Sequence, residues 1–138
     1  MLIKIIQIGK TKDDYLRSGE SEFLKRLSAF CKIEVITLQD EERALNHIGE
    51  SKFVLLDELG IQKTSVEFSD FLKTYKDYGE TLIFVIGGAF GVSDSMKKKA
   101  AHMISLSKMT FTHQMIRIFL LEQLYRAMCI LTGKDYHH

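Results

Sequence analysis

The sequence predicts an α/β fold in which helices cover a mostly parallel sheet. The main observation is that short runs of β-branched and apolar residues alternate along the chain with segments of helical periodicity. The chain has 138 residues, of which 46% are apolar and 27% charged, as is typical of a globular domain and not of a disordered chain. Because it contains no linker or repeat, we expect a single domain over residues 1–138.

Five strands are expected where β-branched or apolar runs are bounded by turn residues. They are Leu2–Ile8, Lys32–Leu38, Phe53–Leu56, Thr81–Ile86 and a short last strand, Ile104–Leu106. The third strand is expected to end at Asp57 and Gly60, and the fourth at Gly87 and Gly88. Loops at the carboxyl ends of such strands are where ligands bind in parallel sheets.

Five helices are expected between and after these strands, because apolar residues recur three or four positions apart. They are Asp13–Phe30, Glu41–Ile48, Thr64–Tyr78, Ser93–Met103 and His113–Leu131. Asp40 and Ser93 can each cap the start of a helix, and Thr64 with Glu67 fits a capping box.

Composition and charge exclude several classes of protein. Cys31 and Cys129 are far apart, which argues against a disulfide scaffold and favours a reducing compartment, so we expect a cytoplasmic protein. The five histidines show no spacing typical of metal ligands, so no metal is expected. A net charge of +1 is too small for bulk electrostatic binding of nucleic acid.

The glycine-rich loop Gly87–Gly91 joins the buried fourth strand to a helix, which is where backbone amides can approach a ligand. A tight turn without a ligand would have the same residues. The spacing is not that of a dinucleotide-binding loop, and no acidic residue for a ribose occurs from Ser95 to Leu121. These two features disfavour a nicotinamide-dependent oxidoreductase, the alternative enzyme class.

The same acid-free stretch carries five basic residues, namely Lys97, Lys98, Lys99, Lys108 and Arg117. Positive charge gathered beside a ligand loop indicates a polyanionic partner, although a solvated helix end would also account for the three consecutive lysines.

The last predicted helix is apolar nearly all round from Met115 to Leu131, which favours burial in a subunit interface. Charged residues interrupt it, so it is not expected to span a membrane. Two of them, Glu122 and Arg126, have the spacing of a helical ion pair, which could be structural or functional.

Four segments in order resemble one known family. They are Phe84-Val-Ile-Gly-Gly-Ala-Phe-Gly91, Leu106-Ser-Lys-Met-Thr-Phe-Thr-His-Gln-Met-Ile-Arg117, Leu121-Glu-Gln-Leu-Tyr-Arg-Ala127 and the ending Tyr136-His137. Together with the opening strand they are similar to the ribosomal RNA large subunit methyltransferase H family, which consists of small bacterial SPOUT-class enzymes. The resemblance covers essentially the whole chain.

The resemblance implies a C-terminal deep trefoil knot, a homodimer packed through the knotted region, and S-adenosylmethionine bound in the knot. It implies methyl transfer to the imide nitrogen of a pseudouridine in 23S rRNA of the assembled ribosome. Carried over by position, the residues that contact the cofactor are Leu56, Gly87, Leu106, Ser107, Lys108, Met109, Thr110 and Phe111. Two alternatives stay open: methylation of another RNA base, and a ribosome-binding module without catalytic activity.

For the chemistry, His113 is the first candidate for a base that removes the imide proton, and His137 is the second. Arg126 could stabilise negative charge on the carbonyl oxygens of the target base, with Glu122 orienting Arg126. The chain departs from the family pattern at three places. Thr112 stands where a proline is usual, and His138 stands at the last position, where the family usually has a basic residue. The segment between Leu38 and Phe53 is also shorter than is typical.

Overall fold

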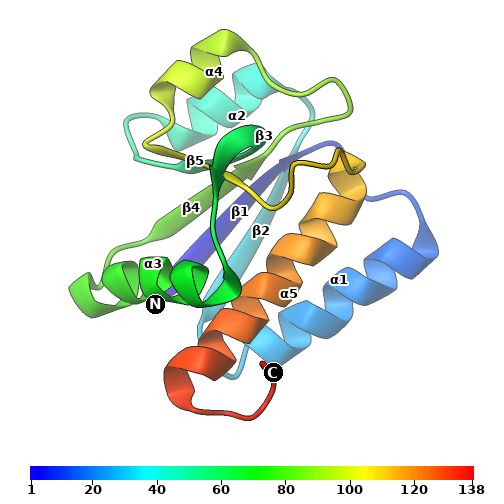
Figure 1. Cartoon of the computed structure of the whole chain (residues 1–138). Coiled ribbons are helices and arrows are strands. Elements are labelled where there is room, and N and C mark those ends of the chain that lie inside the picture. Colours follow the sequence, from blue (N-terminus) through cyan, green and yellow to red (C-terminus); the bar gives the residue numbers. More distant parts are fainter.

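The computed structural model describes residues 1–138 and contains one sheet of five parallel strands in the order β2-β1-β4-β3-β5 (Figure 1). The strands are β1 (Leu2–Ile8), β2 (Lys32–Leu38), β3 (Val54–Gln62), β4 (Leu82–Ile86) and β5 (His102–Ser105). The helices are α1 (Asp14–Leu27), α2 (Glu41–Ile48), α3 (Ser65–Tyr78), α4 (Asp94–Lys99) and α5 (His113–Thr132). The α/β fold with a parallel sheet is therefore confirmed.

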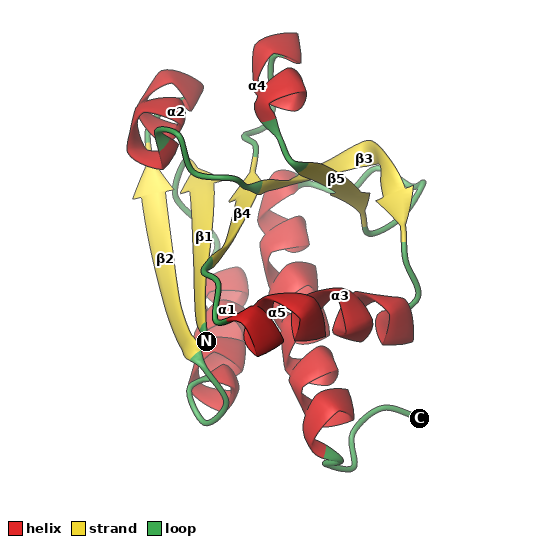
Figure 2. Cartoon of the chain, turned by 90° about the vertical axis from the view of Figure 1, so that its left-hand side faces the viewer, coloured by secondary structure: helices red, strands yellow, loops and turns green.

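Helices cover both faces of the sheet, as the alternation of buried residues along β4 illustrates. Leu82, Phe84 and Ile86 belong to the larger core beneath α1, α3 and α5, whereas Ile83 and Val85 belong to the smaller core beneath α2 and α4. Figures 1 and 2 show α2 and α4 together on one side of the sheet, away from α5. All five residues of β4 are buried, which explains why this strand has a continuous apolar sequence.

The predicted helix starts are confirmed by their caps. The Thr64 hydroxyl accepts a hydrogen bond from the Glu67 amide at 3.1 Å, and the Glu67 carboxylate accepts one from the Thr64 amide at 3.0 Å. Asp40 and Ser93 likewise accept hydrogen bonds from backbone amides in the first turns of α2 and α4. These local contacts are what sequence spacing can predict.

Strand β3 does not end where the sequence predicts. Instead of stopping at Asp57 and Gly60 it continues to Gln62, with a shift of register against β5 between Leu56 and Ile61. The intervening residues bulge out of the ladder, and the chain then returns to pair with Ile104. Gly60 permits this return, because a Cβ atom there would lie 2.6 Å from the carbonyl carbon of Met103.

We expect Gly60→Ala to destabilise the protein by about 2 to 3 kcal/mol, because the added methyl group meets backbone atoms that cannot rotate away. Denaturant unfolding at one protein concentration would measure the change. Leu59→Ala, at the exposed neighbouring position, is the control and should change stability by no more than about 0.5 kcal/mol. Equal stability of Gly60→Ala and the wild type would contradict this account of the bulge.

The segment around residue 100 also differs from the prediction. Helix α4 ends at Lys99 rather than at Met103, and β5 starts at His102 rather than at Ile104. The Ala101 amide donates a 2.9 Å hydrogen bond to the Phe53 carbonyl, and this contact draws the chain into the sheet beside β3. Such pairing between distant segments is not visible in local periodicity.

Helix α5 packs against α1 and α3 and lies over the sheet (Figure 1). This packing within one chain buries much of the apolar surface of α5, including Leu120, Leu124 and Met128. None of the helices combines the length and the apolarity needed to cross a bilayer. The fold also contains no group of three or more side chains that could hold a metal ion.

Candidate active site

A cleft of about 970 Å³ opens beside the bulge of β3 and at the carboxyl ends of β4 and β5. Its walls come from the residues after Leu56, from the glycine loop, and from the segment between β5 and α5. The predicted cofactor residues that line it are Leu56, Gly87, Leu106, Ser107, Met109, Thr110 and Phe111. Lys108, the other predicted residue, lies outside the lining, with its side chain exposed. Three loops that are distant in sequence thus meet at one edge of the sheet.

The glycine loop forms a tight turn on one wall of the cleft. The Gly91 amide donates a 3.0 Å hydrogen bond to the Gly88 carbonyl, and Gly91 has a φ of +76°, which favours glycine. A Cβ atom on Gly87 would lie 2.7 Å from Cγ1 of Val92. Gly87 therefore lets the backbone fold closely over itself beside the cleft.

The segment between β5 and α5 is held by its own hydrogen bonds. The Ser105 hydroxyl donates to the Ser107 carbonyl at 2.7 Å, and the Ser107 hydroxyl accepts from the Met109 amide at 3.0 Å. The Thr110 hydroxyl donates to the Glu58 carboxylate at 2.7 Å, which ties this segment to the bulge of β3. Two of the three loops that form the cleft are thus connected directly.

Sequence reasoning missed the carboxylates of the cleft. Asp57 and Glu58, both from the bulge of β3, line it, and Asp57 lies 3.9 Å from the ammonium group of Lys97. The stretch from Ser95 to Leu121 contains no acidic residue, but β3 brings carboxylates to it. A sequence pattern confined to one segment could not predict that carboxylates from β3 would lie beside its basic residues.

His113 stands at the start of α5 and faces the cleft. Burial, with smaller contributions from the charges of Arg117 and Lys12, lowers the pKa of its imidazole below the usual value. The side chain is therefore neutral at pH 7 and able to accept a proton. Thr112, which replaces the proline usual in the resembling family, caps α5 by accepting a hydrogen bond from the Met115 amide at 3.3 Å.

Arg117 is not available to a polyanion, contrary to the expectation from the acid-free stretch. Its side chain is 1% exposed, and its guanidinium group donates 2.8 Å hydrogen bonds to the carbonyls of Ile8 and Gly9. It also donates to the Thr11 hydroxyl, which in turn donates to Glu20. Arg117 thus fastens the loop after β1 to α5, and its role is structural.

The other predicted catalytic residues form a cluster near the far end of α5. The Glu122 carboxylate accepts a 3.1 Å hydrogen bond from Nε of Arg126 and a 3.0 Å hydrogen bond from the Tyr136 hydroxyl. Nη1 of Arg126 lies 3.2 Å from Nδ1 of His137. Tyr136 also packs edge-on against Tyr125 at 4.7 Å, so the C-terminal tail is anchored to α5. Sequence spacing predicted the Glu122–Arg126 pair, but not the contacts that the tail makes with it.

The donors and acceptors in this cluster are fixed by chemistry. Because a guanidinium group only donates, Nδ1 of His137 must accept the hydrogen bond from Arg126, which leaves the ring proton on Nε2. Burial and the hydrogen bond to Glu122 raise the pKa of the Tyr136 hydroxyl, which keeps its proton. Arg126 and His137 therefore present donors, whereas His113 presents an acceptor.

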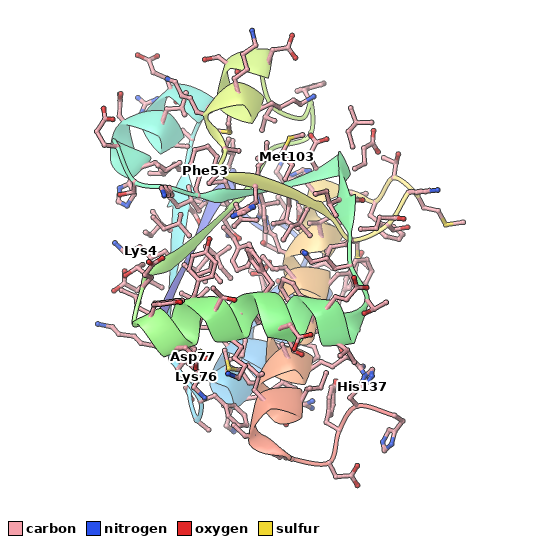
Figure 3. The ribbon with its side chains drawn as sticks, turned by 60° about the vertical axis from the view of Figure 1, so that its left-hand side comes forward. Lys4, Phe53, Lys76, Asp77, Met103 and His137 are labelled. Atoms are coloured by element: carbon pink, nitrogen blue, oxygen red, sulfur yellow. The ribbon has the colours of Figure 1, made fainter.

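Within one chain, His113 lies apart from the cluster of Glu122, Arg126 and His137. His113 and Arg126 are 13 residues apart on α5, which corresponds to about 20 Å along its axis. Figure 3 shows His137 on the tail, at the opposite end of the molecule from Met103 of β5. Glu122 lines a smaller cavity of about 430 Å³, which shares the residues from Ile104 to Ser107 with the cleft. Neither Arg126 nor His137 lines either cavity.

Comparisons with known proteins place this arrangement in a family. The family described as predicted SPOUT methyltransferase matches residues 1–137. A protein of Geotalea daltonii named ribosomal RNA large subunit methyltransferase H is 44% identical and is covered, like this chain, over 100% of its length. A protein of the same name from Clostridium botulinum is 40% identical, with 99% of both chains covered.

Among solved structures, a probable methylase family protein from Haemophilus influenzae Rd KW20 has the same fold. The TM-score is 0.64 at 10% identity, and the match covers 99% of this chain and 70% of that protein. Two kinds of observation indicate the same family. One is the fold, with its strand order and its cleft, and the other is the full-length match to the family and to these relatives. The chain belongs to the SPOUT methyltransferase family, in the group named ribosomal RNA large subunit methyltransferase H.

Proposed function

We propose that this protein transfers the methyl group of S-adenosylmethionine to the imide nitrogen of a pseudouridine in the 23S rRNA of the assembled ribosome. The observation that carries the proposal is the meeting of the glycine loop, the segment between β5 and α5, and the bulge of β3 around one cleft. The names of the curated relatives point to large-subunit rRNA as the substrate. A cytoplasmic location, which ribosome modification requires, follows from the same proposal.

The residues of the cleft fit S-adenosylmethionine, which supplies an activated methyl group when bound. A volume of about 970 Å³ is within the range of small-molecule sites. Leu56, Leu106 and Met109 provide apolar contacts for an adenine ring. Lys108 belongs to the proposal only as part of the segment between β5 and α5, because its side chain is exposed and does not line the cleft.

The deep trefoil knot implied by the resemblance is part of this proposal. The chain leaves the edge strand β5 at Ser105, forms the cofactor segment, and then enters α5, which lies between α1 and α3. Passage of that segment through the loop that follows β3 would hold the walls of the cleft in a fixed relation. Such threading is rare in proteins and would be a specific mark of this family.

A homodimer would complete the active site. His113 and Arg126 are about 20 Å apart along α5 within one chain, too far to contact the same base. In a two-fold interface each subunit offers the same surface to the other, so a residue near one end of α5 can meet the other end of the partner helix. We therefore propose that each active site combines His113 of one subunit with Arg126 of the other.

The proposed roles follow from the protonation states of His113, Arg126 and His137 described above. Neutral His113 accepts the imide proton, with the lowered pKa keeping its nitrogen free at pH 7. Arg126, held by Glu122, donates to a carbonyl oxygen of the target base as negative charge develops there. His137 can donate from Nε2 to the same base, which suits it better to positioning than to proton removal.

Methylation of purified ribosomes, followed by mass spectrometry of the rRNA nucleosides, tests this function. We expect one added methyl group on a large-subunit pseudouridine, formed faster on assembled ribosomes than on free 23S rRNA. A protein with a net charge of only +1 should bind free RNA weakly and in a salt-sensitive manner. A methyl group on another base would restrict the proposal to rRNA methylation, and no added methyl group would leave a binding module.

The lowered pKa of His113 predicts the pH dependence of the transfer step. Protonation should slow single-turnover methylation only as the pH falls below about 6.5, the ordinary histidine value, because the shift keeps the ring neutral above it. His113→Ala should lose this acid limb. His47→Ala, at an exposed position on α2, is the control and should keep the wild-type profile. An unchanged profile in both His113→Ala and His137→Ala would exclude histidine as the base.

A further inference from the structure

The mouth of the cleft is surrounded by exposed apolar side chains. Phe90 is fully exposed, and Leu59, Met109 and Tyr15 are each at least 70% exposed, although all four line the cleft. Single exposed apolar residues are common on protein surfaces, but a group of them around one cleft marks a binding surface.

Phe90 is the most exposed member of this group, and its position is fixed. It occupies the third place of the turn closed by the hydrogen bond from Gly91 to Gly88. Its ring makes no aromatic contact within the chain, whereas Phe111, on the opposite wall, packs edge-on against Phe119 at 5.1 Å. The turn thus holds the backbone of Phe90 at the mouth of the cleft and leaves its aromatic ring exposed to solvent.

The charges near this ring favour a nucleic acid over a protein partner. Lys97 lines the same cleft, and Lys98 and Lys99 follow it on α4 with exposed side chains. The carboxylates of the bulge, Asp57 and Glu58, are engaged with Lys97 and Thr110 respectively. Lys97 is paired with Asp57, whereas Lys98 and Lys99 make no ion pair within the chain and can attract phosphates. The aromatic ring and its apolar neighbours suit a base.

We propose that Phe90 stacks against a nucleobase of the RNA substrate and thereby holds the target nucleotide at the mouth of the cleft. This inference rests on the proposed function, because a base inside a helix must leave its stack before its imide nitrogen can reach a bound cofactor. RNA-binding proteins commonly hold such unstacked bases on aromatic side chains. Phe90 is then a positioning residue for RNA that has no part in binding the cofactor.

The first test separates substrate binding from cofactor binding. Phe90→Leu keeps an apolar side chain but removes the aromatic face, and we expect kcat/KM for ribosomes to fall roughly five- to hundred-fold. Affinity for S-adenosylhomocysteine, measured by calorimetry, should stay within about twofold, since stacking on RNA is not part of that equilibrium. Tyr78→Leu, at an exposed position at the end of α3, is the matched control and should leave both quantities unchanged.

The second test detects stacking without any methyl transfer. The chain contains no tryptophan, so Phe90→Trp introduces a single indole at the proposed contact. Because free RNA is expected to bind weakly, the titration uses low salt and a high concentration of a short oligouridylate. The indole fluorescence should then be quenched in the presence of S-adenosylhomocysteine, and ribosome methylation should stay near the wild-type rate. The same substitution at Tyr78 should show no quenching by the oligonucleotide.

Three outcomes would overturn the inference. An equal loss of cofactor affinity in Phe90→Leu would mean that the ring covers the cofactor. A change of oligomeric state, measured by light scattering, would mean that the ring packs against a second copy. Unchanged kinetics together with an unquenched indole would mean that the ring has no contact with RNA. If the wild type fails to methylate ribosomes, the proposed function fails, whereas quenching of the indole would still support nucleobase stacking.

Discussion

Replacing Gly87 by alanine is expected to weaken binding of S-adenosylhomocysteine by about a hundredfold, or about 3 kcal/mol. The added Cβ atom would lie 2.7 Å from Cγ1 of Val92 and 3.3 Å from the Gly91 backbone. Relief of these contacts requires the Val92 side chain to rotate and the Gly91 backbone to shift by a few tenths of an ångström, and both residues line the cleft. Calorimetric titration of the purified variant would measure the loss.

The neighbouring glycine provides a matched control. A Cβ atom on Gly88 would meet Cγ2 of Ile8 at 3.4 Å, an ordinary van der Waals distance, so Gly88→Ala should bind nearly as well as the wild type. Thermal unfolding of both variants would show whether the fold is retained. Wild-type affinity in Gly87→Ala would mean that the glycine turn does not form the cofactor site.

Substitution of either proposed catalytic side chain should reduce methyl transfer strongly. We expect His113→Ala and Arg126→Ala each to lower the single-turnover rate by roughly a hundredfold or more. His113→Ala removes the proton acceptor, and Arg126→Ala removes the donor that Glu122 holds in place. Both rates should be measured on ribosomes with saturating S-adenosylmethionine, so that changes in cofactor affinity do not contribute.

Mixing the two variants tests whether the active site is shared between subunits. After co-refolding, about half of the dimers contain one subunit of each kind, and each of these would have one site with both residues intact. The mixture should therefore recover about a quarter of wild-type activity. Equal inactivity of the mixture and of the single variants would contradict a site that combines His113 with the partner's Arg126.

Local features of the fold could be predicted from the sequence, because short-range chemistry determines them. The caps at Asp40, Thr64 and Ser93 and the strand Lys32–Leu38 are where the residue patterns place them. The course of β3 beyond Leu56 could not be predicted. Its continuation depends on pairing with β5, some 40 residues later, and on the close backbone approach at Gly60.

The candidate site could likewise be predicted only in part. Family motifs marked the segments that meet in the cleft, but they could not show which charges come from elsewhere in the fold. Glu58 and Asp57 face the acid-free stretch from another strand, and Arg117 is buried against backbone carbonyls. The tail contact of Tyr136 with Glu122 likewise depends on tertiary packing, which spacing along one helix does not reveal.

The most direct test of the whole account is a crystal structure of the protein with S-adenosylhomocysteine. We expect the ligand in the cleft beside the bulge of β3 and the ends of β4 and β5, against Leu56, Gly87 and the segment from Leu106 to Phe111. We also expect a two-fold dimer in which Arg126 of the partner lies near His113. A ligand bound elsewhere, or an Arg126 that no subunit brings near the cleft, would contradict the account.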